Sequence, residues 1–97
     1  MSDDTHDIHY QKTWGTPLGQ DCIDFDTSLA RWLGDRLEFL SKHTNTHPTN
    51  YDTLEHWHKD LSHHGNTLQK YAQNSTEIKN AREAMRWVAE HFGAFWD

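Results

Sequence analysis

The sequence is poor in the aliphatic and phenyl side chains that usually build a core. Leu, Ile, Val and Phe account for 16 of the 97 residues, below the roughly 20% under which a chain is commonly disordered. Five Trp and three Tyr compensate in part, because aromatic rings bury large areas. The length allows one small domain and excludes a large two-domain enzyme, and so small a core would gain stability from self-association.

Long apolar runs and paired cysteines are also absent. No apolar run exceeds three residues, whereas a membrane-spanning helix needs about 20. Cys22 is the single cysteine, so it forms no internal disulfide and no paired-cysteine zinc site. The opening residues lack the basic and apolar parts of a secretory signal. We therefore expect a soluble, intracellular protein without a membrane partner.

The sequence has no excess of positive charge. It contains 15 Asp and Glu against 9 Lys and Arg, and residues 1–26 carry most of the net charge of −6. Nonspecific nucleic-acid binding needs a basic face that releases counterions from phosphates. We therefore expect no direct nucleic-acid partner, while the acidic N-terminal segment suits a basic protein partner.

Catalytic motifs are missing as well. The chain has no GxSxG, no Gly-rich phosphate loop and no HExxH. Asp21, Asp24 and Asp26 resemble the acidic clusters that hold magnesium, but helix caps and solvated turns explain them equally well. We name no catalytic residue and no cofactor, and we expect a protein that is not an enzyme.

Residues 1–24 show no helical period, and a proline and two glycines interrupt them within five residues. We interpret them as an irregular acidic arm with a turn over 15–19. Its apolar side chains are predicted to hold the arm against the body: Trp14, Leu18 and Ile23.

Residues 25–97 show helical periodicity in three stretches. The first covers 27–43, with Asp26 as its N-cap. The second follows the capping box of residues 52–55, and the third covers 75–92 and stops near Gly93. Because short connections favour antiparallel neighbours, we predict an all-α fold, a small antiparallel three-helix bundle with an irregular N-terminal arm.

The first stretch carries two polar groups on its apolar stripe. The stripe that we predict to be core consists of Leu29, Trp32, Leu33, Leu37, Phe39 and Leu40. Arg36 and His43 fall in the middle of it, and a buried guanidinium needs a partner. One interpretation is structural, in which Arg36 pairs with Asp24 or Asp26 or extends past its neighbours to water. The other is that Arg36 and His43 line a pocket for a phosphate or carboxylate.

The second stretch carries a histidine-rich flank. His56, Asp60 and His64 follow one another at intervals of four residues, so neighbouring members could share a divalent metal. A chain with nine histidines produces such spacings by chance. We treat the three as weak metal candidates, and the alternative is a solvated flank with pH-dependent charge.

The third stretch adds further binding candidates. Arg82 and Arg86 lie one turn apart and could hold an anion together, although a surface ion pair of Arg86 with Glu90 is the simpler explanation. Trp57 lies on an apolar stripe and is either core or a stacking platform. Trp87 lies opposite Ile78 on the helical wheel, so we predict that it is exposed or committed to an interface, and we assign Trp96 to a partner interface too.

Residues from 24 to 97 resemble a group of small uncharacterised helical proteins encoded by bacteriophages and integrated mobile elements. The resemblance is carried by Phe25–Ala30, Arg36–Leu37, His47–Pro48, Trp57 with Leu61, and Phe92–Asp97. It implies a setting in the cytoplasm of a host cell and no reaction. It also draws attention to Asp26, Arg36 and Trp57, which occupy its anchor positions.

The combined observations favour a small non-enzymatic binding protein, a phage or mobile-element accessory factor. It would sequester a nucleotide-like anion through Asp26, Arg36, His43, Trp57, Arg82 and Arg86, or block a host protein with its acidic arm and Trp87. The alternatives are a metal-dependent hydrolase using the cluster of His56, Asp60 and His64, and a virion or assembly component. A homo-oligomer is also open, because so small a chain has surface to hide.

Overall fold

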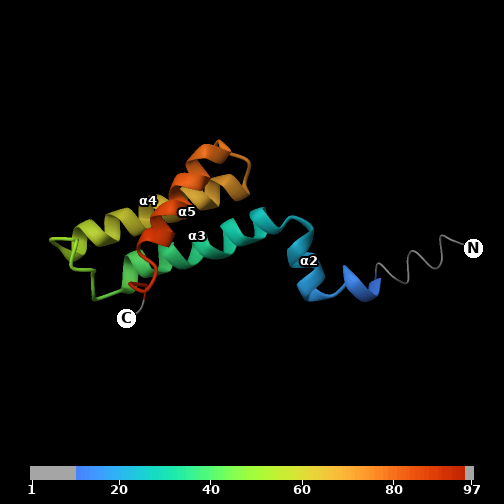
Figure 1. The fold of residues 1–97 in the computed structure, drawn as a ribbon, viewed down its shortest axis with the longest axis horizontal. Coiled ribbons are helices and arrows are strands. Elements are labelled where there is room, and N and C mark those ends of the chain that lie inside the picture. The colour runs from blue at the N-terminus through green and yellow to red at the C-terminus, as the bar shows by residue number, and fades with distance from the viewer. Residues whose placement is uncertain (1–10, 96–97) are drawn as a thin grey trace, which may run out of the picture.

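The computed structural model describes residues 11–95, and all regular secondary structure in that part of the chain is helical. The main helices are α2 (Pro17–Ile23), α3 (Phe25–His43), α4 (Leu54–Ala72) and α5 (Ile78–Glu90) (Figure 1). Their packing fits a helical bundle and confirms the all-α prediction. Within residues 11–95, no helix combines the length and the apolar character needed to cross a membrane.

Helices α3 and α4 lie side by side along most of their length (Figure 1). The Ser62 hydroxyl donates to Glu38 Oε1 at 2.9 Å, and the Tyr71 hydroxyl donates to Asp26 Oδ2 at 2.5 Å. Residue numbers therefore fall along α4 as they rise along α3. The long connection of residues 44–53 joins the two helices at one end, where His58 Nε2 lies 2.7 Å from the carbonyl of Thr44.

Two glycines allow α3 and α4 to approach closely. A Cβ atom added to Gly34 would lie 2.8 Å from the carbonyl oxygen of Gly65, and one added to Gly65 would lie 3.0 Å from the carbonyl oxygen of Gly34. Both distances are shorter than an ordinary van der Waals contact, so any side chain here would push the backbones apart. We call this contact the glycine seam.

The buried face of α3 differs from the predicted one. It consists of Ala30, Gly34, Leu37 and Ser41, whereas the predicted core residues Trp32 and Phe39 are 55% and 63% exposed. Leu33 and Leu40 lie at the boundary and pack against the core. The prediction is confirmed for Leu37, but the centre of the buried face was misplaced, because the face with small side chains approaches α4 and large side chains would hold the helices apart.

The core lies between α4 and its two neighbours. Trp57, Leu61 and Leu68 of α4 are almost fully buried. Helix α5 contributes Ala81, Ala84 and Val88. The helical spacing predicts that Ile78 lies on the buried stripe of this helix together with Ala81, Met85 and Val88. In the structure Ile78 is 50% exposed and Ala84 is buried, so the buried face is rotated from Ile78 toward Ala84.

Two predicted helix caps are displaced. Thr53, rather than Asp52, is the N-cap of α4, and its side chain accepts a hydrogen bond from the His56 amide at 3.1 Å. Helix α3 begins at Phe25, so Asp26 lies in its first turn instead of at the cap. Both changes are shifts within one turn, which leaves the side chain of Asp26 available for a contact with α4.

The N-terminal arm is not irregular throughout. Residues 17–23 form α2, because Pro17 suits the first turn of a helix and the Thr16 hydroxyl accepts a hydrogen bond from the Gly19 amide. Helix α2 projects away from the packed helices (Figure 1). The three side chains that were predicted to hold the arm against the body are exposed by 39%, 76% and 47%: Trp14, Leu18 and Ile23.

Candidate functional site

An apolar pocket opens where the start of α3, the end of α4 and the start of α5 meet. Its volume is about 210 Å³. Apolar side chains form most of its lining, and three polar residues complete it: Leu29, Ala30, Leu68, Ile78, Ala81, Met85, with Asp26, Tyr71 and Arg82. The small side chains of Ala30 and Ala81 leave this space unfilled, because both are buried and neither reaches across it.

Asp26 and Tyr71 form a fixed polar pair at this pocket. The Tyr71 hydroxyl donates to Asp26 Oδ2 at 2.5 Å, and the Thr27 amide donates to Asp26 Oδ1 at 2.9 Å. The hydrogen bond from Tyr71 is the main cause that lowers the pKa of Asp26 below its ordinary value, and it raises the pKa of Tyr71. Asp26 is therefore an anion at neutral pH, and Tyr71 keeps its proton.

Arg82 supplies the positive charge at the pocket. No hydrogen bond or ion pair within residues 11–95 engages its guanidinium. Its charge acts on Tyr71 in the direction that lowers the tyrosine pKa, against the larger effect of Asp26. The pocket therefore combines an apolar bed with one free cation and one carboxylate that is already hydrogen-bonded.

The structure separates the other predicted anion ligands from this pocket. Arg36 is exposed; its guanidinium lies over the Trp32 ring at 4.1 Å from the centroid and donates to the Trp32 carbonyl at 3.0 Å. His43 is exposed next to Phe39, with ring centroids 4.3 Å apart. The expectation that Arg36 and His43 lie on the core face was wrong, because α3 packs on α4 through its opposite side.

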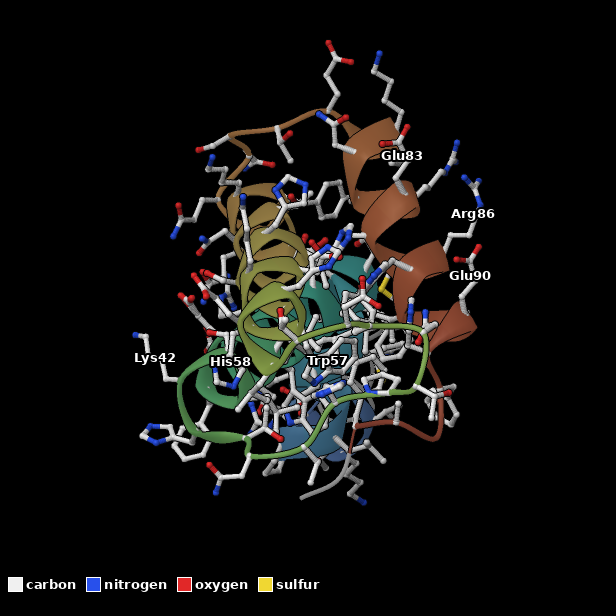
Figure 2. The ribbon with its side chains drawn as sticks, turned by 90° about the vertical axis from the view of Figure 1, so that its left-hand side faces the viewer. Lys42, Trp57, His58, Glu83, Arg86 and Glu90 are labelled. Atoms are coloured by element: carbon white, nitrogen blue, oxygen red, sulfur yellow. The ribbon has the colours of Figure 1, made fainter. Side chains whose placement is uncertain are left out.

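Arg86 points in another direction. Figure 2 shows it on the outer side of α5, beside Glu83 and Glu90 and away from the packed helices. Arg86 and Arg82 are one turn apart, but Arg86 does not line the pocket that Arg82 lines.

Trp57 and Trp87 belong to the interior. Trp57 is 1% exposed and lies at the centre of the packed side chains (Figure 2). Trp87 is half-buried and packs against it, with ring centroids 5.3 Å apart. Of the two alternatives predicted for Trp87, exposure is wrong, because the buried face of α5 lies between Ile78 and Trp87 and each residue flanks one side of it; a role of Trp87 in an interface stays a prediction. Trp96 lies outside the described residues.

A hydrogen-bonded chain accompanies this aromatic cluster. The Trp87 indole donates to the Tyr51 hydroxyl at 3.1 Å, and Tyr51 donates to Asp60 Oδ2 at 2.6 Å. Burial, together with the bond to Asp60, raises the pKa of Tyr51 to about 12. The sequence suggested Tyr51 only as a core residue or a stacking ring, and its place directly before the capping box of α4 was the available signal for the role of its hydroxyl.

The predicted metal candidates do not form a metal site. His56 Nε2 lies 3.7 Å from Asp60 Oδ2, but His64 stacks on Trp87 with ring centroids 4.4 Å apart. Within residues 11–95, no group of three or more His, Cys, Asp or Glu side chains is arranged to hold a metal ion. Burial against Trp87 is the main cause that lowers the pKa of His64, and the charge of His63 adds to it.

The pocket thus brings together two predicted binding residues, Asp26 and Arg82, with one that was missed. The helical spacing places Tyr71 on the apolar stripe, as a core residue or a ring for stacking, and its position next to the last residue of α4 was the only hint that the hydroxyl could reach α3. Comparison with protein-family models, with curated proteins and with solved structures gives no match for this chain.

Proposed function

We propose that the protein is a small non-enzymatic binding protein that sequesters an amphipathic molecule with one negative charge. The observation that carries this proposal is the apolar pocket with the unengaged guanidinium of Arg82 at its edge. Pockets that bind small molecules are mostly apolar and contain a few polar groups that orient the ligand. A ligand would match this lining if its apolar body packed against Ala81 and Met85 and its anionic end lay at Arg82.

The charge of the pocket favours a monoanion over a polyphosphate. Among the described residues that line it, Arg82 is the one cation, and Asp26 adds a negative charge to the same lining. A nucleotide with several phosphates would meet only one guanidinium and would be repelled by the carboxylate. A small carboxylate with an aromatic or aliphatic body fits the volume of about 210 Å³ better.

The proposed setting is the cytoplasm of a host cell that carries a phage or mobile element, in line with the resemblance of residues 24–97. In this proposal the body is an antiparallel three-helix bundle of α3, α4 and α5. A factor without catalytic groups can act there by occupying a ligand. Blocking a host protein with the acidic arm has less support, because Trp87 packs against Trp57 instead of extending outward.

The test is a titration observed by methyl and amide NMR, using benzoate and hexanoate as probes. We expect shifts of the Ala81 and Met85 methyl groups that saturate, with millimolar or tighter affinity. Arg82→Gln should weaken binding of the probes at least fivefold, because it removes the charge and keeps the length of the side chain.

Arg86→Gln is the matched control, since Arg86 loses the same charge on the same helix outside the pocket. It should leave the affinity within twofold of the native value. Shifts that map elsewhere, or equal losses in the two variants, would overturn the proposal. Native mass spectrometry of the protein from its natural source would then identify the retained molecule by mass.

A further inference from the structure

Helix α3 carries a second apolar face, opposite to the one that packs on α4. Phe25, Trp32 and Phe39 follow one another at intervals of seven residues and are 58%, 55% and 63% exposed. Residues seven apart lie nearly above one another on a helix, so the three rings form a stripe about 21 Å long. We call it the outer stripe. A helix with apolar faces on both sides is typical of a helix that is covered on both sides.

The outer stripe is large for a surface feature of so small a domain. Its three rings expose roughly 400 Å² together, about half of the 800 Å² that each partner of a stable dimer buries. An open depression lined by Asp21, Phe25, Ser28, Leu29 and Trp32 extends the stripe toward α2. Arg36 lies over the Trp32 ring, and Trp and Arg are both enriched among the residues that contribute most to binding at interface centres.

The stripe is symmetric about its middle residue. Phe25 and Phe39 each lie seven residues from Trp32, one toward each end of α3. If two copies of α3 cross in opposite directions with a two-fold axis at Trp32, each Phe25 faces the partner's Phe39. The two Trp32 rings then meet at the axis, as an isologous interface requires.

The charges along the stripe are complementary under the same operation. Between residues 13 and 30 the charged residues are all acidic; Asp21 and Asp24 are exposed, whereas Asp26 is turned to α4 by the hydrogen bond from Tyr71. Beyond Trp32, the outward cations are Arg36 and Lys42 (Lys42 is labelled in Figure 2). The acids of that half are turned to α4, since Asp35 accepts from Gln69 at 3.0 Å and Glu38 accepts from Ser62 at 2.9 Å.

We propose that the outer stripe of α3 binds the same stripe of a second copy of this chain, in antiparallel orientation with the two-fold axis at Trp32. The acidic end of each α3 then lies against the basic end of the other. A parallel arrangement would place like charges together, and an unrelated partner would have no reason to match the symmetric spacing of the rings. The ligand pocket shares Leu29 with the depression beside the stripe, but its α5 residues Ala81, Arg82 and Met85 are not part of the outer stripe, so the variants that test the two proposals are different.

The first test is the mass of the full chain in solution, measured by sedimentation equilibrium from 1 to 200 µM. We expect twice the 11.5 kDa of one chain at the upper concentrations. Trp32→Glu places two negative charges at the axis and should raise the dissociation constant at least 50-fold while the circular dichroism spectrum stays helical. Phe92→Glu is the matched control, because Phe92 is 84% exposed and lies beyond α5; it should leave the dimer intact.

The second test fixes the orientation, in a Cys22→Ser background because the native cysteine is exposed. Phe25→Cys and Phe39→Cys chains, mixed and treated with a short bismaleimide, should form the mixed dimer in at least fivefold excess over either self-linked dimer. Preferential self-linking would overturn the antiparallel arrangement. A monomer at every concentration, or a dimer that survives Trp32→Glu, would overturn the proposal and leave the stripe to a different protein.

Discussion

Helix α4 has two neighbours, and it packs against them in opposite ways. Toward α3 it presents Gly65, whose backbone touches that of Gly34 at the glycine seam. Toward α5 it presents Trp57, whose ring packs against Trp87 at a tilt, and His64, which stacks on Trp87; an unfilled pocket lies farther along the same two helices. The contact of α4 with α3 depends on the absence of side chains at Gly34 and Gly65. The contact of α4 with α5 is made by large rings, and space remains beside them.

The difference shows where this small domain is rigid and where it can change. Backbones in contact cannot accept added atoms without moving a whole helix. Rings and a pocket can accept or lose atoms with local adjustment, and among their side chains are two of the titratable groups with shifted pKa values, Tyr51 and His64. We therefore expect the glycine seam to determine stability, and the α4–α5 side to respond to ligands and pH.

The largest expected effect comes from adding a methyl group at the seam. Gly34→Ala would place its Cβ 2.8 Å from the Gly65 carbonyl oxygen, and we expect a loss of about 2 kcal/mol in the free energy of unfolding, despite the better helix propensity of alanine. Urea unfolding followed by circular dichroism measures it. Asn66→Ala, on the exposed side of α4, is the control and should be neutral or stabilising. A stable Gly34→Ala would contradict the close contact.

The second effect is a loss of stability at alkaline pH. The pKa of Tyr51 is raised from its ordinary value of 10 to about 12 in the folded chain. The unfolded chain therefore loses this proton first as pH rises. The contribution is complete below pH 10 and is lost between pH 10 and 12, on the order of 1–2 kcal/mol after solvent screening.

Unfolding midpoints in urea at pH 9 and pH 11 measure this loss. Tyr51→Phe removes the titrating group, so it should lower stability at pH 9, where Asp60 and the Trp87 indole lose a partner, and flatten the change above pH 10. An equal alkaline loss in Tyr51→Phe would assign the effect to other groups.

The third effect is a loss of stability at acidic pH. Because the pKa of His64 is lowered below 6.5 in the folded chain, the unfolded chain takes up this proton first as pH falls. The contribution is complete above pH 6.5 and is lost below it. Asp60, His63 and His91 act on the same imidazole, and Asp60 opposes the two histidines.

His64→Phe should keep the stacking on Trp87 and retain more of its stability at pH 5 than the native chain does. His47→Gln, in the exposed connection between α3 and α4, should follow the native curve. Tryptophan fluorescence during urea unfolding at pH 7 and pH 5 measures both. If the two variants behave alike, the acid response does not come from His64.

The smallest effect has the opposite sign to the first. Ala81→Val adds two carbons toward the pocket, and filling an apolar cavity should stabilise the chain by about 0.5 kcal/mol. The same variant should bind benzoate more weakly. Differential scanning calorimetry and the NMR titration measure the two changes. Destabilisation would mean that the α4–α5 side is as tightly packed as the seam.

The sequence predicted the positions of the long helices but not the rotation of α3. The predicted stretch 27–43 lies within Phe25–His43. This prediction succeeded because apolar residues recur with the helical period inside the helix, and polar, turn-forming residues follow its end. The buried face was missed because hydrophobicity ranks Trp32 above Gly34, whereas close helix packing needs the smaller residue. The spacing of residues alone does not say which of two faces approaches a neighbour.

The candidate site was predictable only in part, for a related reason. Asp26 was selected because it occupies an anchor position of the resemblance, and Arg82 because its guanidinium can hold an anion; both line one pocket. Arg36 and His43 were selected for their chemistry and because the predicted rotation of α3 placed them on the core face. In the structure that face, which carries the outer stripe, is at the surface, so both side chains are exposed. Tyr71 and Tyr51 act through hydroxyls that reach another segment, and such long-range pairs leave no periodic signal.

The glycine seam also has a consequence for the order of folding. It joins consecutive helices through one connection of ten residues, 44–53, so its contacts are local in the chain and can form early. Helix α5 can then dock on a finished hairpin. We expect Gly34→Ala to slow refolding in stopped-flow experiments, whereas Ala81→Val should leave the refolding rate unchanged and slow unfolding.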